Sequence, residues 1–342
     1  MNTRSNPLDL ARRSVTLPTG TLELTLDKGA MEADDLLGFA ARANAKRGFL
    51  FLSKVLGKHW PVTPSSMLQV HDRIAATVPP VDGPIVFIAM AETAIGLGQG
   101  VFEAWLRAHP DREALFVHTT RYRVGSGDLI EFEEAHSHAP RQFLHMPEDP
   151  ALRALLLNAG TLVLVDDEAS TGNTFLNLSN ACRRLNPGIA RVHLATITNF
   201  MGREATDGLS ARFGLPVTMG ALVDGEYRFQ PGDYVAPNDA AQRFDPDADR
   251  GASTRFGRLG LCRALNAPEH LAERLAGEFA PGATVAVLGT GEFMHAATLL
   301  GAALARRGVD VKVQSTTRSP ILTWGAVSHA LRFPDNYGEG VA

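Results

Sequence analysis

Short, dense apolar runs alternate with longer amphipathic segments over much of the chain. Four runs rich in Val, Ile and Leu have the density of strands buried on both faces: 84–90, 114–124, 161–167 and 190–198. Helical spacing follows the first run to about Ala108, and follows the third from Thr171 to about Leu185. Strands alternating with helices predict an α/β fold, a mostly parallel sheet with helices on both faces.

The segments outside these runs are less regular. Polar and apolar residues alternate over 14–28 around Pro18-Thr19-Gly20, which predicts a small hairpin. Apolar residues recur at helical spacing from 34 to 44, so we expect a helix there. Residues 47–67 pass from an apolar run into a Lys-rich loop closed by proline. The acidic, Gly-flanked segment 125–145 lacks a sustained period, which is typical of a structureless functional lid.

The pattern changes after residue 200. Residues 200–250 are rich in Pro, Gly and Asp, and we interpret them as a connection with a short hairpin. A second strand-helix-strand unit follows, with strands at 283–289 and 309–315. The length of 342 residues fits two domains. The expected boundaries are 14–205 for the first domain, 206–250 for the connection and 251–335 for a smaller α/β domain.

Composition excludes several classes of protein. The formal net charge of −4 argues against a nucleic-acid-binding protein, and 45% hydrophobic with 20% charged residues is typical of a globular chain. The longest apolar run, at 296–305, is half of the ~20 residues that a membrane span needs. Cys182 and Cys262 are too few for a disulfide framework. We therefore expect a cytoplasmic protein that binds neither membrane nor nucleic acid.

The segment VLVDDEASTGNT at 163–174 carries the clearest chemistry. An apolar strand ends in Asp166 and Asp167, and a loop of small and hydroxyl residues then enters a helix. Backbone N–H groups at such a turn form an anion site, and the adjacent carboxylates can accept hydrogen bonds from vicinal hydroxyls. A phosphate on one side and a diol on the other describe a sugar 5-phosphate. The candidate phosphate-binding residues are Ala169, Ser170, Thr171, Gly172, Asn173 and Thr174.

Three other interpretations of this segment are possible. A strand followed by two aspartates also opens a receiver domain, but there the acidic pair lies near the start of the chain. A Walker P-loop requires a first glycine and a lysine, where this chain has Glu168 and Asn173. A strand followed by a simply capped helix explains Thr171 but not the two carboxylates together with the small residues.

The segment resembles the PRPP-binding motif of type I phosphoribosyltransferases. The resemblance implies that Asp166 and Asp167 hold the ribose 2- and 3-hydroxyls and contact Mg²⁺ through substrate or water. It also implies that residues 169–174 bind the 5-phosphate. Glu168 departs from the family, many of whose members carry an apolar residue at that position. The resemblance also implies the family's fold, in which a parallel sheet flanked by helices is covered by a hood. Here the hood would come from the first 60 or so residues and from residues after 200.

Other segments extend the resemblance. The turn after the strand at 84–90 resembles the family's pyrophosphate loop, formed here by Ala91, Glu92, Thr93 and Ala94; a βα turn with small packing residues is the alternative. Segment 125–140 matches the position of the flexible catalytic loop. A diphosphate needs positive charge opposite it, so Lys54 and Lys58 are candidates for binding it and Arg121 is a candidate catalytic residue. Each of the three is equally well explained as a surface cation.

The whole chain, over about 14–335, resembles the phosphoribosyltransferases with a C-terminal TRSP domain found in tellurium-resistance-associated gene clusters. The name of that domain corresponds to the one-letter codes of four successive residues here, Thr317, Arg318, Ser319 and Pro320. Gly289 and Gly291 follow a strand and precede a helix, an anion-friendly turn that lacks the third glycine of a dinucleotide motif. Arg318 is suited to clamp a phosphate or carboxylate, although a capped turn ended by proline explains this segment equally well.

The resemblance implies an orotate phosphoribosyltransferase-like enzyme. It would use PRPP and Mg²⁺ to ribosylate a base-like acceptor, release pyrophosphate, and act as a homodimer. The alternative is a regulator that binds PRPP without turnover, and a basic nucleic-acid-binding appendage would indicate it. The net charge of −4 gives no sign of one. The acceptor is not defined by the sequence.

Overall fold

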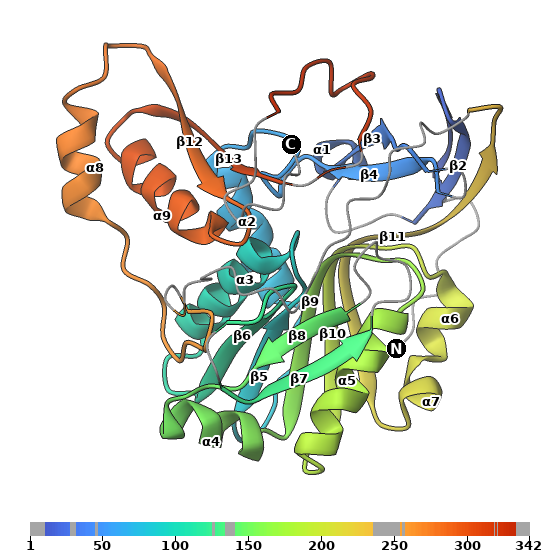
Figure 1. Ribbon diagram of the computed structural model, residues 1–342, viewed down its shortest axis with the longest axis vertical. Coiled ribbons are helices and arrows are strands. Elements are labelled where there is room, and N and C mark those ends of the chain that lie inside the picture. The colour runs from blue at the N-terminus through green and yellow to red at the C-terminus, as the bar shows by residue number, and fades with distance from the viewer. Residues whose placement is uncertain are drawn as a thin grey trace.

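The computed structural model describes residues 11–27, 32–44, 47–124, 127–133, 141–234, 254, 257–317, 319 and 321–332. Within this part of the chain a nine-stranded sheet has the order β1-β2-β11-β10-β9-β5-β6-β8-β7, as Figure 1 shows. Its strands are β1 (Ala11–Leu17), β2 (Gly20–Leu26), β5 (Ile85–Ala89), β6 (Ala114–Thr120), β7 (Leu129–Glu133), β8 (Arg141–His145), β9 (Thr161–Ala169), β10 (Arg191–Asn199) and β11 (Val217–Pro231).

The centre of this sheet is parallel and its two ends are antiparallel. Strands β6, β5, β9, β10 and β11 pair in parallel, as the alternation of strands and helices predicts. Strands β8 and β7 extend one end antiparallel, and the hairpin of β2 and β1 extends the other. The mixed α/β architecture with one large sheet is that of the type I phosphoribosyltransferase fold expected from the sequence.

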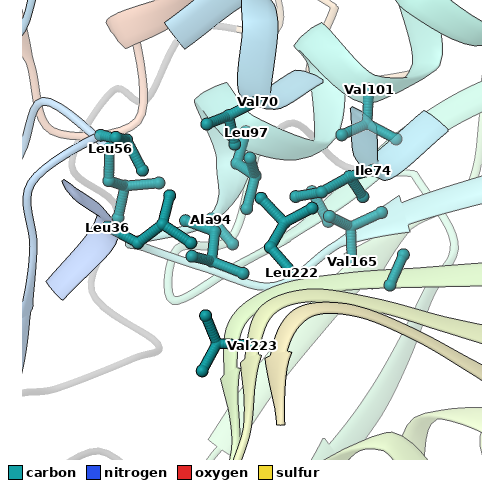
Figure 2. Packing of buried hydrophobic residues seen from close by; sticks show 14 of the residues in the cluster. Leu36, Leu56, Val70, Ile74, Ala94, Leu97, Val101, Val165, Leu222 and Val223 are labelled. Atoms are coloured by element: carbon teal, nitrogen blue, oxygen red, sulfur yellow. The ribbon is translucent and has the colours of Figure 1, made fainter. Parts of the chain in front are cut away.

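Helices cover both faces of the parallel strands because those strands are apolar on both faces. Phe87 of β5 packs into one core cluster with α2 (Pro64–Ala75) and α3 (Ile95–Ala108). Its neighbours Val86 and Ile88 pack into the opposite cluster with α4 (Pro150–Asn158) and α5 (Asn173–Leu185). Figure 2 shows the first cluster, in which Val70, Ile74, Leu97 and Val101 of the helices meet Val165 and Leu222 of the sheet. The cores therefore fix the carboxyl end of each strand relative to the others.

The hood lies over the carboxyl ends of the parallel strands. It contains α1 (Ala33–Leu36) and the antiparallel pair β3 (Leu37–Ala41) and β4 (Phe49–Ser53). The expected helix over 34–44 is therefore wrong beyond its first turn. Leu37, Ala40 and Ala41 are buried in β3, where pairing with the apolar β4 satisfies the backbone and covers both segments.

Two further segments are more regular than expected. The lid-like segment 125–145 contains β7 and β8, which pair from Leu129 opposite His145 to Glu133 opposite Arg141. The expected connection 206–250 begins within α6 (Arg203–Asp207) and includes α7 (Leu209–Phe213) and β11. β11 runs parallel to β10 as far as Asp224 and antiparallel to β2 from Gly225, so the large sheet extends to Pro231.

The C-terminal unit contains α8 (Glu269–Ala276), β12 (Thr284–Thr290), α9 (Met294–Ala305) and β13 (Asp310–Thr316). β12 and β13 form a parallel pair, which confirms the predicted strand-helix-strand arrangement. Its core also contains Val62 and Met67 from the first half of the chain. Val62 and Val313 exchange backbone hydrogen bonds of 3.0 and 2.7 Å. Among the described residues, no helix is both long and apolar enough to cross a bilayer.

Candidate active site

The two aspartates lie where β9 extends beyond its neighbour β5. The pairing of β5 with β9 ends with Ala89 opposite Val165, whereas β10 continues along β9 to Ala169. Asp166, Asp167 and Glu168 therefore occupy the carboxyl end of the strand and are half-buried there. The Asp167 amide donates to Asp166 Oδ1 over 2.9 Å. Burial raises the pKa of Asp167.

The loop after β9 turns sharply into α5. Gly172 caps the helix with φ +70°, and a Cβ there would lie 3.0 Å from Met201 Sδ and 3.3 Å from Arg212 Nη1. Arg212 of α7 donates to the Thr171 carbonyl over 2.5 Å and also donates to Asn173 Oδ1. This cation beside the candidate phosphate loop is not among the site residues predicted from the sequence. No local pattern could have revealed it, because Arg212 is 39 residues from Asn173.

Glu168 connects the end of β9 to the hood. Arg47 donates to Glu168 Oε1 over 2.7 Å, and the two side chains are 32% and 15% exposed. Burial raises the pKa of Glu168 to about 7, although the positive charge of Arg47 acts in the opposite direction. The position where the chain departs from the motif of the family thus holds an ion pair between the sheet and the hood.

The turn expected to bind pyrophosphate lies between β5 and α3. The Ala91 amide donates to Thr119 Oγ1 over 2.7 Å and the Ala94 amide to the Met90 carbonyl over 3.2 Å. These two amides therefore donate hydrogen bonds within the protein. Glu92 and Thr93 lie between them, and the peptide bond from Ala91 to Glu92 is cis.

The three candidate cations lie in different surroundings. Lys58 is buried, and its ammonium lies 3.3 Å from Glu92 Oε1 and 2.7 Å from the Gly291 carbonyl oxygen. Lys54 donates to the Asp34 carbonyl over 2.8 Å, so its ammonium is held by the hood. Arg121 follows β6 directly and is half-buried, and among the described residues its Nε has no hydrogen-bond partner.

The candidates in the C-terminal unit lie at the carboxyl ends of β12 and β13. Gly291 follows β12 with φ +50°, and its amide is 3.1 Å from Thr316 Oγ1. A Cβ on Gly289 would lie 2.9 Å from Met294 Cα, so the strand closely approaches α9 there. Ser319 Oγ is 2.9 Å from His59 Nε2. Thr317 follows β13, and Arg318 lies outside the described residues.

The carboxylate oxygens at the end of β9 suit a hard cation such as Mg²⁺. Within the described ranges, no group of three or more His, Cys, Asp or Glu side chains is arranged to hold a metal ion. That Asp166 and Asp167 contact Mg²⁺ through substrate or water stays a prediction from the sequence.

Comparison with known proteins agrees with this architecture. Residues 36–226 match the family described as phosphoribosyl transferase, and residues 253–341 match the TRSP domain found C-terminal to it. Among curated protein sequences, none is significantly similar to the chain.

Solved structures of similar fold include three phosphoribosyltransferases. Adenine phosphoribosyltransferase from Trypanosoma brucei is 12% identical, with coverage of 56% of this chain and 77% of that one and a TM-score of 0.38. The enzyme from Giardia lamblia is 15% identical, with coverages of 56% and 97% and a TM-score of 0.37. Orotate phosphoribosyltransferase from Francisella tularensis is 16% identical, with coverages of 55% and 80% and a TM-score of 0.33. The match to the phosphoribosyl transferase family covers more than half of the residues of this chain. The chain therefore belongs to the phosphoribosyltransferase family and carries that family's C-terminal TRSP domain.

Proposed function

We propose that this protein uses PRPP and Mg²⁺ to ribosylate a base-like acceptor with release of pyrophosphate. Membership of the family supports phosphoribosyl transfer in general. The observation that carries the proposal is the arrangement at the end of β9. There, Asp166 and Asp167 lie next to a Gly172-capped loop that opens α5.

This arrangement suits the two ends of a ribose 5-phosphate. Asp166 and Asp167 accept hydrogen bonds from the 2- and 3-hydroxyls, whose donors compensate the burial of Asp167. Residues 169–174 surround the 5-phosphate with backbone amides and hydroxyls at the positive end of the α5 dipole. Arg212 keeps the loop in this shape through its bonds to Thr171 and Asn173.

The diphosphate lies on the opposite side of the ribose. Lys58 and Arg121 supply positive charge there, and Glu92 and Thr93 supply backbone amides. Lys54 is the third candidate cation, and its ammonium donates to the Asp34 carbonyl. Mg²⁺, when bound with the diphosphate, neutralises part of the charge on the leaving group.

The reaction is a displacement at C1. The bond from C1 to the diphosphate oxygen breaks as a bond to the acceptor forms, and the acceptor loses a proton. The transition state is oxocarbenium-like, by analogy with glycosyl transfer. The acceptor lies under the hood, next to Glu168 and Arg47, where it is shielded from water. An orotate-like acceptor, which is anionic, would find a cation in Arg47.

We also infer a cytoplasmic homodimer that acts in a biosynthetic, tellurium-resistance-associated gene cluster, in line with the resemblance of the sequence. The second candidate function is a PRPP-binding regulator without turnover. The net charge of −4 favours the enzyme, because no basic surface for nucleic acid is evident from the composition.

Titration calorimetry with PRPP and Mg²⁺ tests the sugar-phosphate site. We expect binding by the wild type and its loss in Asp166→Asn/Asp167→Asn. The control is Asp82→Asn/Asp111→Asn, which changes two exposed carboxylates in the loops before β5 and β6, at the other edge of the sheet. Unchanged PRPP affinity in the first variant would contradict the proposed site. A screen of acceptors for pyrophosphate release then separates the enzyme from the regulator.

A further inference from the structure

In the C-terminal unit, the carboxyl ends of β12 and β13 lie next to the proposed PRPP site. The residues that follow β12 and β13 contact the segment at 57–59, which adjoins the pyrophosphate turn through Lys58. The Ser315 amide donates to the Gly57 carbonyl over 2.7 Å, and Gln314 Nε2 donates to the Lys58 carbonyl over 3.1 Å. Figure 1 shows this unit and the hood above the same end of the large sheet.

Lys58 is the centre of these contacts. Its side chain is 1% exposed, and its ammonium bridges Glu92 of the pyrophosphate turn and the Gly291 carbonyl of the C-terminal unit. A buried ammonium requires fixed acceptors, and among the described residues the C-terminal unit provides one of them, the Gly291 carbonyl.

Glu292 makes a second connection next to the first. It is 5% exposed, and its Oε1 accepts a hydrogen bond of 2.7 Å from Thr120 Oγ1 at the end of β6. Its other oxygen, Oε2, accepts from Arg258, which is itself buried. Thr120 precedes Arg121, so Glu292 holds the strand end that carries a candidate cation for the diphosphate.

We propose that the C-terminal TRSP unit is a structural part of the diphosphate half of the PRPP site, with Glu292 as a positioning residue. Gly291 fixes the ammonium of Lys58, and Glu292 fixes the end of β6. This inference rests on the proposed function and assigns to the TRSP unit a role in binding the leaving group. It requires no separate reaction in the second unit.

The test compares ligands that contain different parts of PRPP. The affinities of the full-length protein for Mg²⁺-PRPP, Mg²⁺-pyrophosphate and ribose 5-phosphate are measured by calorimetry. In Glu292→Gln, we expect the affinities for PRPP and pyrophosphate to fall about tenfold or more, the effect of losing a charge-assisted hydrogen bond. The affinity for ribose 5-phosphate stays within about twofold of that of the wild type.

Glu269→Gln is the matched control, because Glu269 lies on α8 of the same unit in exposed ion pairs with Arg306 and Arg307. It leaves all three affinities unchanged. If Glu292→Gln does not fold, Thr120→Val removes the bond to Glu292 with little change of volume, and the same loss of affinity is expected. Folded variants that bind pyrophosphate as tightly as the wild type overturn the inference. A wild type that binds no PRPP instead contradicts the proposed function.

Discussion

The guanidinium of Arg47, two residues before β4, lies 2.7 Å from the carboxylate of Glu168 at the end of β9. The pair joins the hood to the strand that carries Asp166 and Asp167, across 121 residues of sequence. Removing one member of a buried pair leaves the other charge without compensation. The pair thus contributes most to stability when Glu168 is ionised.

Arg47→Met is expected to destabilise the protein in a pH-dependent way. At about pH 8, where Glu168 is ionised, the variant loses about 1–3 kcal/mol of unfolding free energy. At about pH 5, where most Glu168 is protonated, the loss is smaller. Urea unfolding at the two pH values measures the difference. Arg13→Met, which breaks the more exposed pair with Asp34, is the control, and equal losses at both pH values for Arg47→Met would contradict the prediction.

Glu168 also gives the wild type a pH-dependent stability. Its pKa is about 7 in the folded protein against 4.5 normally, so the folded state binds a proton that the unfolded state has released. Stability therefore falls as pH rises from about 4.5 to about 7, by up to about 3 kcal/mol from this group. In Glu168→Gln this fall is absent from the stability profile. The exposed Glu204→Gln serves as a control that retains it.

Gly172→Ala is expected to weaken the candidate phosphate loop. The positive φ costs an alanine about 1–2 kcal/mol, and the added Cβ would lie 3.0 Å from Met201 Sδ. Thermal unfolding and ribose 5-phosphate binding should both decline. Gly160→Ala is the matched control, since no atom lies within 4 Å of its added Cβ. Normal ribose 5-phosphate affinity in Gly172→Ala would show that the loop does not bind the phosphate.

Arg212→Met tests the cation beside the same loop. Loss of its bonds to Thr171 and Asn173 is expected to lower the affinity for ribose 5-phosphate about tenfold, because the loop must then be ordered by the ligand. Affinity for pyrophosphate, measured by the same calorimetry, changes little. Arg184→Met, on the exposed end of α5, controls for loss of charge. An equal loss for both ligands would place the effect of Arg212 outside the phosphate loop.

Sequence patterns predicted the parts of the fold whose interactions are local or repetitive. The runs that became β5, β6, β9 and β10 are buried on both faces, so their composition alone indicates strands. Segment 34–44 was misinterpreted because the choice between helix and strand depended on pairing with β4, which lies outside the segment. Strand β11 was missed for the same reason, since Gly225 and Pro231 suggest turns until β2 pairs with them.

The residues of the candidate site also differ in how far the sequence predicts them. Asp166, Asp167 and the loop after them form one contiguous motif, so their chemistry is evident from sequence order. Arg212 and the bridge from Lys58 to Gly291 depend on tertiary contacts across 39 and 233 residues. No periodicity or spacing encodes such contacts, and only the packing of α7 and the C-terminal unit reveals them.

β11 joins two parts of the large sheet, since one uninterrupted strand pairs in parallel with β10 and then antiparallel with β2. Its alternation turns Tyr227 and Phe229 inward to the aromatic cluster around Phe49, while Glu226 and Arg228 are exposed. Substitutions at these inward positions therefore act first on the packing between β11 and the hood strand β4, and they leave the residues at the end of β9 unchanged.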